Sequence, residues 1–177
     1  MVVTVIITVG YSLIITAPGI KEANEQPQVD SVVIEEPEDE EEIVDFIHTS
    51  KRDSVIAFAL KHLGTPYVYG SCSADGFDCS GFVYYVFKHF KIDVPRSSSQ
   101  YKDFGKTISI EKVKKGDILV FLSPTRNEIG HLGIVTKPAG METEFIHSSS
   151  GKEMEVMISS LKQEGYKRRY VKSITVL

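Results

Sequence analysis

Residues 64–90 read GTPYVYGSCSADGFDCSGFVYYVFKHF, and the second cysteine of this stretch is the residue around which the fold is predicted. Before Asp78, glycines and a proline interrupt any regular element, at Gly64, Pro66, Gly70 and Gly76. After Gly81, apolar residues recur at helical spacing, at Val83, Val86, Phe87 and Phe90. The stretch therefore predicts an irregular loop that delivers Cys79 onto the first turn of a helix capped by Asp78.

A thiol at a helix N-terminus is well placed to act as a nucleophile. Free backbone N–H groups and the positive end of the helix dipole favour the thiolate, so we expect the pKa of Cys79 to be lowered. The alternative is a buried structural cysteine. The flanking Asp-Cys-Ser-Gly sequence is too small and too polar for core packing, which favours the nucleophile.

Six short segments of the chain together form a recognisable pattern. The first two are PYVYG at 66–70 and GFDCSGFV at 76–83. The others are VPRSS at 94–98, KGDILVF at 115–121, GHLGIV at 130–135 and FIHSS at 145–149. In this order they resemble the NlpC family of bacterial cell-wall peptidases. The resemblance extends over roughly residues 54–172. It implies a papain-like α+β fold, with N-terminal helices and the nucleophile helix packed on an antiparallel sheet, and a Cys–His–polar triad that cuts peptidoglycan stem peptides.

The order of elements read from the residues also indicates the α+β class, because helices come first and strands follow. A first helix is predicted from a cap at Asp53, with Ile56, Ala59, Leu60 and Leu63 on its buried face. Strands joined by short polar turns are predicted at 118–121, 131–136, 143–148, 155–158 and 169–176.

The chain divides into three parts by composition. Residues 2–20 carry no charge and are just long enough for a short membrane span, so residues 1–20 are predicted to be a signal sequence or a membrane anchor. A buried strand is the other interpretation of this run. Residues 21–50 contain a block of acidic residues at 35–42 and are predicted to be a disordered linker. Residues 51–177 are predicted to form the NlpC-type domain.

The charge is unevenly divided between these parts. Residues 1–50 hold one Lys and eleven acidic residues, whereas residues 51–177 hold nineteen Lys and Arg and thirteen acidic residues. A basic domain suits a polyanionic target such as the cell wall. Its basic residues are scattered, with 167–169 the one tight cluster, so a nucleic-acid partner is not expected. We expect an exported protein, periplasmic, associated with the cell envelope or secreted.

Of the five histidines, two are candidates for the site. His131 follows Gly130 at the start of an apolar strand, and we expect it to be the partner of the Cys79 thiol. His147, on the next strand, is the third, orienting residue that the resemblance implies. His48, in the linker, and His62 and His89, near helix ends, are expected to be solvated.

Five further residues are expected to contact substrate or the oxyanion. The resemblance assigns Tyr67 a polar contact beside the nucleophile, and the other four are Asp78, Ser80, Arg96 and Ser97. Two cysteines and distant histidines lack the spacing of a metal site, and no cofactor is expected. A Cys72–Cys79 disulfide would disable the nucleophile and is disfavoured.

The resulting hypothesis is a cysteine peptidase that hydrolyses an amide bond of the murein stem peptide through an acyl-enzyme. The favoured bond joins γ-D-glutamate to the diamino acid, and the main alternative is the D-Ala–diamino acid cross-link. Two competing hypotheses are a cell-wall amidase and an inactive wall-binding module. The order of Cys before His argues against thiol acyltransferases acting on lipids.

Overall fold

The computed structural model describes residues 51–177, so the predictions for residues 1–20 and 21–50 lie outside the described residues. A first helix occupies residues 51–60. The longer elements after it are α2 (Cys79–His89), β4 (Ile118–Leu122), β5 (Ile129–Lys137), β6 (Glu144–Ser148), β7 (Val156–Ser160) and β8 (Tyr170–Thr175). The shorter ones are β1 (Cys72–Ser73), β2 (Gly76–Phe77), η1 (Ser98–Lys102), β3 (Lys106–Ile108), η2 (Ile110–Lys112), η3 (Gly140–Glu142) and α3 (Glu164–Lys167).

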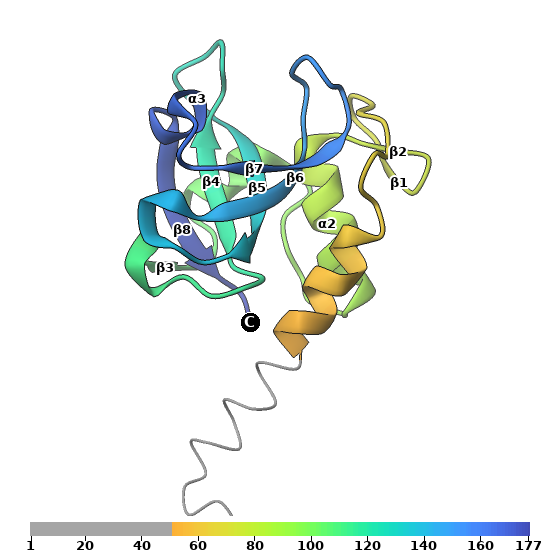
Figure 1. Cartoon of the computed structure of the whole chain (residues 1–177). Coiled ribbons are helices and arrows are strands. Elements are labelled where there is room, and N and C mark those ends of the chain that lie inside the picture. The colour runs from red at the N-terminus through yellow and green to blue at the C-terminus, as the bar shows by residue number, and fades with distance from the viewer. Residues whose placement is uncertain (1–50) are drawn as a thin grey trace, which may run out of the picture. The chain divides into compact units, whose positions relative to one another are not determined.

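Six strands form one sheet in the order β3-β8-β4-β5-β6-β7, and every neighbouring pair is antiparallel. The first helix and α2 lie together on one side of this sheet (Figure 1). This arrangement confirms the predicted α+β class, with the nucleophile helix packed on an antiparallel sheet.

The five predicted strands are all present, with ends that differ by two residues at most. Their apolar residues made them recognisable, because most of their side chains are buried. The prediction missed the shorter elements: β3 has three residues, β1 and β2 have two each, and α3 has four. Such short pieces carry too few residues to show a period.

The first helix differs from its prediction in its start and in its buried face. The helix already includes residue 51, so Asp53 is not its cap, and its carboxylate instead pairs with Lys115 Nζ at 2.8 Å. Leu60 and Leu63 are 37% and 48% exposed. The buried positions follow the same helical spacing from an earlier start, at Arg52, Val55, Ile56 and Ala59.

An arginine in the buried face explains this shift. Arg52 Nη1 lies 2.8 Å from Asp117 Oδ1, and its guanidinium also donates to the backbone of Lys115, the Thr175 hydroxyl and the carbonyl of Leu177. The charge is buried because it is paired and hydrogen-bonded. It fastens the first helix to the sheet side of the domain.

The α2 helix begins where the sequence predicts. Asp78 is the N-cap, and its side chain accepts the backbone N–H of Gly81 at 2.6 Å. Gly81 has a steric role as well, since a Cβ there would lie 2.1 Å from the carbonyl oxygen of Ser71. Only glycine lets the preceding loop approach the helix so closely.

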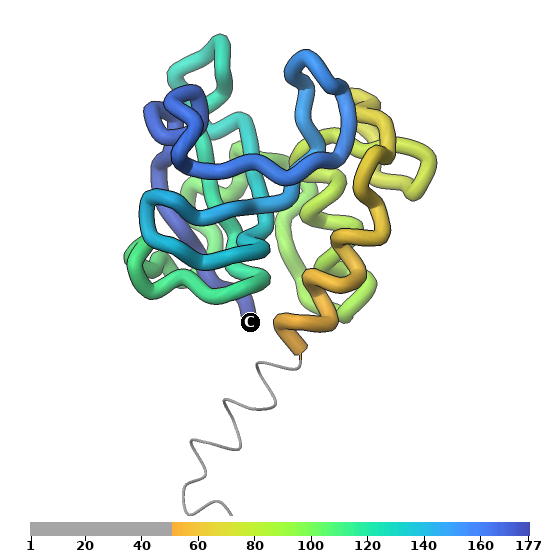
Figure 2. The backbone as a smooth tube through the Cα atoms, viewed as in Figure 1, coloured from red at the N-terminus to blue at the C-terminus, as the bar shows by residue number. Residues whose placement is uncertain are grey.

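The loop before α2 is fixed by backbone hydrogen bonds to the start of β7. Gly64 donates to Val156, Tyr67 donates to Met154, and Val156 donates back to Thr65, all within 2.9 Å. Figure 2 shows this loop, in yellow, running beside the blue segment between β6 and β7. The backbone before Asp78 is therefore irregular, as predicted, but hydrogen bonds fix its position.

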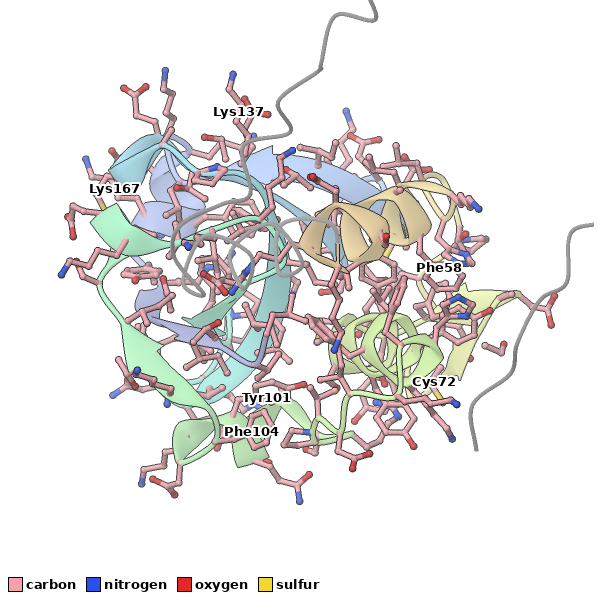
Figure 3. The ribbon with its side chains drawn as sticks, turned by 90° about the horizontal axis from the view of Figure 1, so that it is seen from below. Phe58, Cys72, Tyr101, Phe104, Lys137 and Lys167 are labelled. Carbon is pink, nitrogen blue, oxygen red and sulfur yellow. The ribbon has the colours of Figure 1, made fainter. Side chains whose placement is uncertain are left out.

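Apolar residues pack on both faces of the sheet. One cluster joins the sheet to the helices through Phe82, Val86, Leu132, Ile134 and Ile146, among others. The second cluster lies on the opposite face and contains Leu119, Phe121, Val135, Phe145 and Leu161, together with Ile110 and Val113. In the view from below, Phe58 and Cys72 lie on the helical side, and Lys137 and Lys167 lie on the sheet side (Figure 3). The site described next lies where these two sides meet.

Candidate active site

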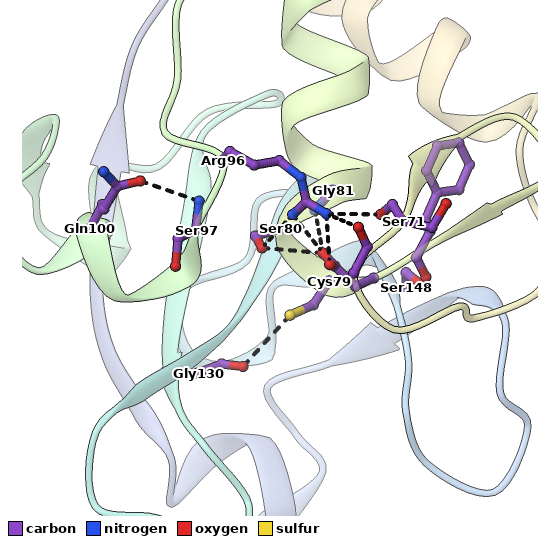
Figure 4. Close-up of polar contacts among 12 residues, drawn as sticks. Ser71, Cys79, Ser80, Gly81, Arg96, Ser97, Gln100, Gly130 and Ser148 are labelled. Carbon is purple, nitrogen blue, oxygen red and sulfur yellow. Dashed lines mark hydrogen bonds and ion pairs between the residues drawn. The ribbon is translucent and has the colours of Figure 1, made fainter.

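Cys79 is the first residue of α2 and is partly exposed. Its thiol donates to the carbonyl of Gly130, the residue before His131, with a sulfur–oxygen distance of 3.6 Å (Figure 4). Cys72 is exposed on β1, and both cysteines are free thiols. The helix start thus brings the thiol to the beginning of β5.

A charged network surrounds the helix start. Arg96 forms a two-pronged ion pair with Asp78, with Nη1–Oδ1 and Nη2–Oδ2 distances of 3.0 and 2.8 Å. Its Nη2 also donates to the carbonyls of Gly70 and Ser71, and Nη1 donates to the Ser80 hydroxyl. Figure 4 shows these bonds converging on one guanidinium. Arg96 therefore ties the loop, the cap and the helix together.

The histidines come from neighbouring strands and lie on one face of the sheet. In the β5–β6 register Val135 pairs with Phe145, and side chains alternate between faces, so His131 and His147 both share the face of those two residues. His131 Nε2 lies 3.0 Å from His147 Nδ1, with the rings nearly perpendicular. Gly133, between His131 and Val135 on the same face, leaves room for the Phe145 ring, because a Cβ there would lie 2.4 Å from it.

Two hydroxyl groups complete the row of polar side chains. The Ser159 hydroxyl on β7 lies 2.9 Å from His147 Nε2, and the Tyr166 hydroxyl on α3 lies 3.3 Å from the same nitrogen. The Tyr166 ring also stacks on the His131 ring, with centroids 6.1 Å apart. Both histidines and Ser159 are buried, so these partners satisfy groups that water does not reach.

The pKa of the Cys79 thiol is shifted in the direction opposite to the one that the sequence predicts. Burial first, and the Asp78 carboxylate second, raise the pKa of Cys79 to about 11, although the backbone N–H groups of Ser80 and Cys79 and the Arg96 charge oppose this. Burial, the neighbouring His147 and the Arg169 charge hold the pKa of His131 well below 6.5. These shifts run against the lowered thiol pKa that the helix start predicts, and they favour a neutral thiol beside a neutral imidazole.

His147 is uncharged for the same reasons. Burial, followed by the Arg169 charge, lowers its pKa to about 4. Arg169 is held in place by hydrogen bonds to the carbonyls of Gly165 and Leu122, and its guanidinium lies 4.9 Å from the centre of the Tyr166 ring. A cation thus lies beside two neutral histidines.

Cys79 lies at the junction of two pockets. The smaller, of about 250 Å³, is lined by His131, Tyr166 and Arg169 as well as Cys79. The larger, of about 760 Å³, extends over Asp78, Ser80, Arg96 and the serines 97–99. Tyr67, Cys79, Pro124, Gly130 and Ser150 line both. The loops between β4 and β5 and between β6 and β7 project at this end of the domain (Figure 1).

The seven other residues predicted for the site lie around Cys79 or are joined to it through His131. His131 and His147 are joined to each other, and Tyr67, Asp78, Ser80, Arg96 and Ser97 line the larger pocket. Asp78, Ser80 and Arg96 also bond to one another, which the sequence did not indicate. Ser159, Tyr166 and Arg169 were missed. The sequence shows Arg169 only as part of the basic cluster at 167–169, and nothing in that cluster indicates a position beside the two histidines.

The two remaining histidines of the described residues pack against aromatic rings. His62, expected to be solvated, is half-buried, with its ring edge-on to Phe77 and Tyr85. His89 is exposed but stacks on Phe58 with centroids 3.9 Å apart. Neither lies at the site. In the part of the chain that the structure describes, no helix is long and apolar enough to span a bilayer.

Residues 64–175 match the model of the NlpC/P60 family. The chain belongs to the NlpC/P60 family. This is a family of papain-like cysteine peptidases that hydrolyse peptidoglycan. The match contains the loop before α2, α2 itself, both histidines of the site and the hydroxyl groups beside them, which confirms the resemblance found in the sequence.

Two curated relatives illustrate the range of activities. The chain is 37% identical over 117 residues to the gamma-DL-glutamyl hydrolase of Bacillus subtilis, covering 65% of this chain and 27% of the relative. It is 31% identical over 115 residues to the murein DD-endopeptidase MepS/murein LD-carboxypeptidase of Escherichia coli, covering 64% and 57%. The chain thus spans less than two thirds of the length of these relatives.

Solved structures show the same fold. An NlpC/P60 family protein from Bacillus cereus superposes with a TM-score of 0.64 at 29% identity, covering 71% of this chain and 40% of that one. The NlpC/P60 domain of the peptidoglycan hydrolase SagA gives a TM-score of 0.56 at 28% identity, covering 70% and 97%.

Proposed function

We propose that this chain is a cysteine endopeptidase that hydrolyses an amide bond of the peptidoglycan stem peptide through an acyl-enzyme at Cys79. The observation that carries the proposal is the hydrogen-bonded row of His131, His147 and Ser159, whose first member lines the smaller pocket together with the partly exposed thiol of Cys79. A nucleophile, a base and an orienting group are the parts that acyl transfer requires.

The hydrogen bonds favour one arrangement of protons. To accept the thiol proton on Nδ1, His131 must carry its own proton on Nε2, which then donates to His147 Nδ1 at 3.0 Å. His147 in turn carries its proton on Nε2 and donates to the Ser159 hydroxyl at 2.9 Å. Each donor along the row meets one acceptor. The row therefore holds His131 in the form that can act as a base.

Catalysis begins from the neutral pair. As Cys79 Sγ attacks the scissile carbonyl, His131 Nδ1 takes the thiol proton and then gives it to the leaving amine. His131 next removes a proton from a water that attacks the thioester, and the thiol is restored. The backbone N–H of Cys79, at the start of α2, would donate to the oxyanion. Tyr67, which lines both pockets, would supply a second polar contact.

The favoured bond is the one between γ-D-glutamate and the diamino acid. Two similar proteins of Bacillus subtilis carry names of this chemistry, the gamma-DL-glutamyl hydrolase and, at 33% identity, the gamma-D-glutamyl-L-lysine dipeptidyl-peptidase. The second candidate is the D-Ala–diamino acid cross-link, supported by the 31% identity to MepS.

Digestion of two purified muropeptides, a monomer and a cross-linked dimer, followed by mass spectrometry, tests the proposal. Cleavage of the monomer after γ-D-glutamate supports the favoured bond. Conversion of the dimer to intact monomers alone supports the cross-link, and release of the whole peptide from the sugar indicates an amidase. No cleavage by folded protein would leave the inactive wall-binding module. Because peptidoglycan lies outside the cytoplasmic membrane, the proposed substrate also requires export, by a signal sequence or an anchor in residues 1–20.

A further inference from the structure

The two pockets give the substrate a direction, if the proposed function holds. The leaving amine must lie within reach of His131, which lines the smaller pocket and is absent from the lining of the larger one. The acyl half of the substrate must therefore extend the other way, past Asp78 and Arg96, into the pocket of about 760 Å³.

The acyl half of a stem peptide ends in a sugar. In murein, two amino-acid residues precede the γ-D-glutamyl bond, and the first is attached to N-acetylmuramic acid. Two extended residues reach about 7 Å. A sugar-linked substrate would thus place its pyranose ring beyond Asp78, within or at the rim of the larger pocket.

Tyr69 lies on that wall and is 91% exposed. Within the described residues its ring makes no stacking or edge contact, whereas Tyr67, two residues earlier, lines both pockets. An aromatic side chain that is almost fully exposed loses hydrophobic stabilisation unless something covers it.

The backbone that carries Tyr69 is fixed. Ser71 donates to the Val68 carbonyl at 3.1 Å, which closes a tight turn with Tyr69 and Gly70 at its centre, and Gly70 has φ +76°. Val68 donates to Phe77, and Arg96 donates to the carbonyls of Gly70 and Ser71. The ring therefore stands on a rigid turn, so a ligand that covers it has little backbone to order.

Hydroxyl groups share the pocket with this ring. They come from η1 and the residues before it and from the loop after β4: Ser97, Ser98, Ser99, Ser123 and Thr125. A pyranose has an apolar C–H face that stacks on aromatic rings and an edge of hydroxyl and acetamido groups. The larger pocket presents both kinds of partner.

We propose that Tyr69 is the stacking platform of a saccharide subsite, which binds the N-acetylhexosamine ring of a stem peptide still attached to its glycan. This subsite makes the chain selective for sugar-linked stem peptides over free ones. It assigns a role to an exposed aromatic residue that the catalytic row does not use.

Kinetics on two matched substrates test the subsite. One is the free tetrapeptide and the other is the same peptide attached to the murein disaccharide. Tyr69→Ala should raise KM for the sugar-linked peptide about tenfold and leave the free peptide within about twofold, because only the former loses the stacking contact. Tyr69→Phe keeps the ring and should behave as wild type, as should Val171→Ala, an exposed apolar residue on β8 outside both pockets.

A binding measurement separates this subsite from the proposed activity. In full-length Cys79→Ala protein, titration with the disaccharide alone should be detectable by NMR, and adding Tyr69→Ala should abolish it. Binding with no hydrolysis by wild type would keep the subsite and overturn the proposed function. Equal changes for both substrates in Tyr69→Ala, or unchanged disaccharide binding, would overturn the subsite.

Discussion

The two sides of Cys79 are built on different physical principles. On the helical side, charges meet directly: Arg96 neutralises Asp78 and bonds to three backbone or hydroxyl oxygens besides. On the sheet side, His131 and His147 are buried and neutral, and their contacts are hydrogen bonds between uncharged groups. The thiol lies between a charged frame and a neutral row.

This difference separates positioning from proton transfer. Fixed charges near the thiol hold its helix and loop in place, while burial keeps the base unprotonated at neutral pH. We therefore expect changes on the sheet side to affect the rate of chemistry, and changes on the helical side to affect substrate binding and stability. The predictions below test this division, from the largest expected effect to the smallest.

Replacing the thiol should have the largest effect. Cys79→Ala should lower kcat/KM for muropeptides by about 10⁴-fold or more, because no covalent intermediate can form. Cys72→Ala is the matched control, and should retain activity within about twofold because Cys72 is exposed on β1 outside both pockets. Product analysis by mass spectrometry gives the rates, with circular dichroism to verify folding. Substantial activity in folded Cys79→Ala protein would refute the assignment.

The two histidines should differ in severity. His131→Ala removes the base and should lower kcat by about 10³-fold. His147→Ala removes an orienting group that water can partly replace, and about 10- to 100-fold is expected. In both variants KM should change little. Equal losses would show that the roles of the two histidines are misassigned.

The neutral row should make the domain sensitive to acid. His147 has an unfolded pKa of 6.5 and a folded pKa of about 4, so below pH 6.5 the unfolded state binds a proton that the native state does not. Stability is fully present above pH 6.5 and falls on acidification toward pH 4. The slope is up to about 1.4 kcal/mol per pH unit for each such histidine, or about 3 kcal/mol for His147 over this range.

Urea unfolding measured across this pH range tests the effect. His147→Gln should flatten the dependence, and His89→Gln, at an exposed position on α2, should leave it unchanged. If the free energy of unfolding still depended on pH in the double variant His147→Gln, His131→Gln, the acid sensitivity would arise elsewhere in the protein.

Loss of the charged frame should act mainly on binding. Arg96→Ala leaves Asp78 without its two-pronged partner and frees the carbonyls of Gly70 and Ser71. We expect KM to rise about tenfold, with a loss of roughly 1 kcal/mol in stability, because the Arg96 side chain is 35% exposed. Arg96→Lys should not restore KM, since one ammonium cannot make these bonds together. A fall in kcat at unchanged KM would contradict the division between the two sides.

The smallest effect is expected at Ser159. Ser159→Ala should lower kcat no more than about fivefold, because the Tyr166 hydroxyl already lies 3.3 Å from the same nitrogen of His147. Adding Tyr166→Phe should lower kcat by more than the product of the two single effects. Simple multiplication of the two effects would show that the hydroxyl groups do not substitute for each other.

The sequence predicted the helical side of the site better than the sheet side. Asp78, Cys79 and Gly81 are neighbours in the chain, so their roles as cap, first helical residue and close-approach glycine follow from local rules. Apolar runs likewise located the main strands. Ser159, by contrast, meets His147 only through the register of β6 and β7, which no local pattern specifies.

The burial of individual side chains was the second feature that the sequence did not reveal. The predicted first helix began after Arg52, because an arginine alone gives no sign that it is buried. Its partner Asp117 lies 65 positions away in the chain. The pKa of Cys79 was predicted in the wrong direction because the helix start was visible in the sequence, whereas the loss of solvent around the thiol was not.

The close approach at Gly81 has a consequence for recognising relatives of this chain. A side chain at position 81 would collide with the carbonyl of Ser71 whether or not the protein has activity. A glycine at this position is therefore a requirement of the fold and not of the chemistry. Cys79 has no such structural requirement, because its side chain is partly exposed and its hydrogen bond to the Gly130 carbonyl is a weak contact. A homologue that kept the glycine and lost the cysteine would keep this fold and lack the nucleophile. Gly81 therefore indicates whether a homologue has this fold, whereas Cys79 indicates whether it has the nucleophile.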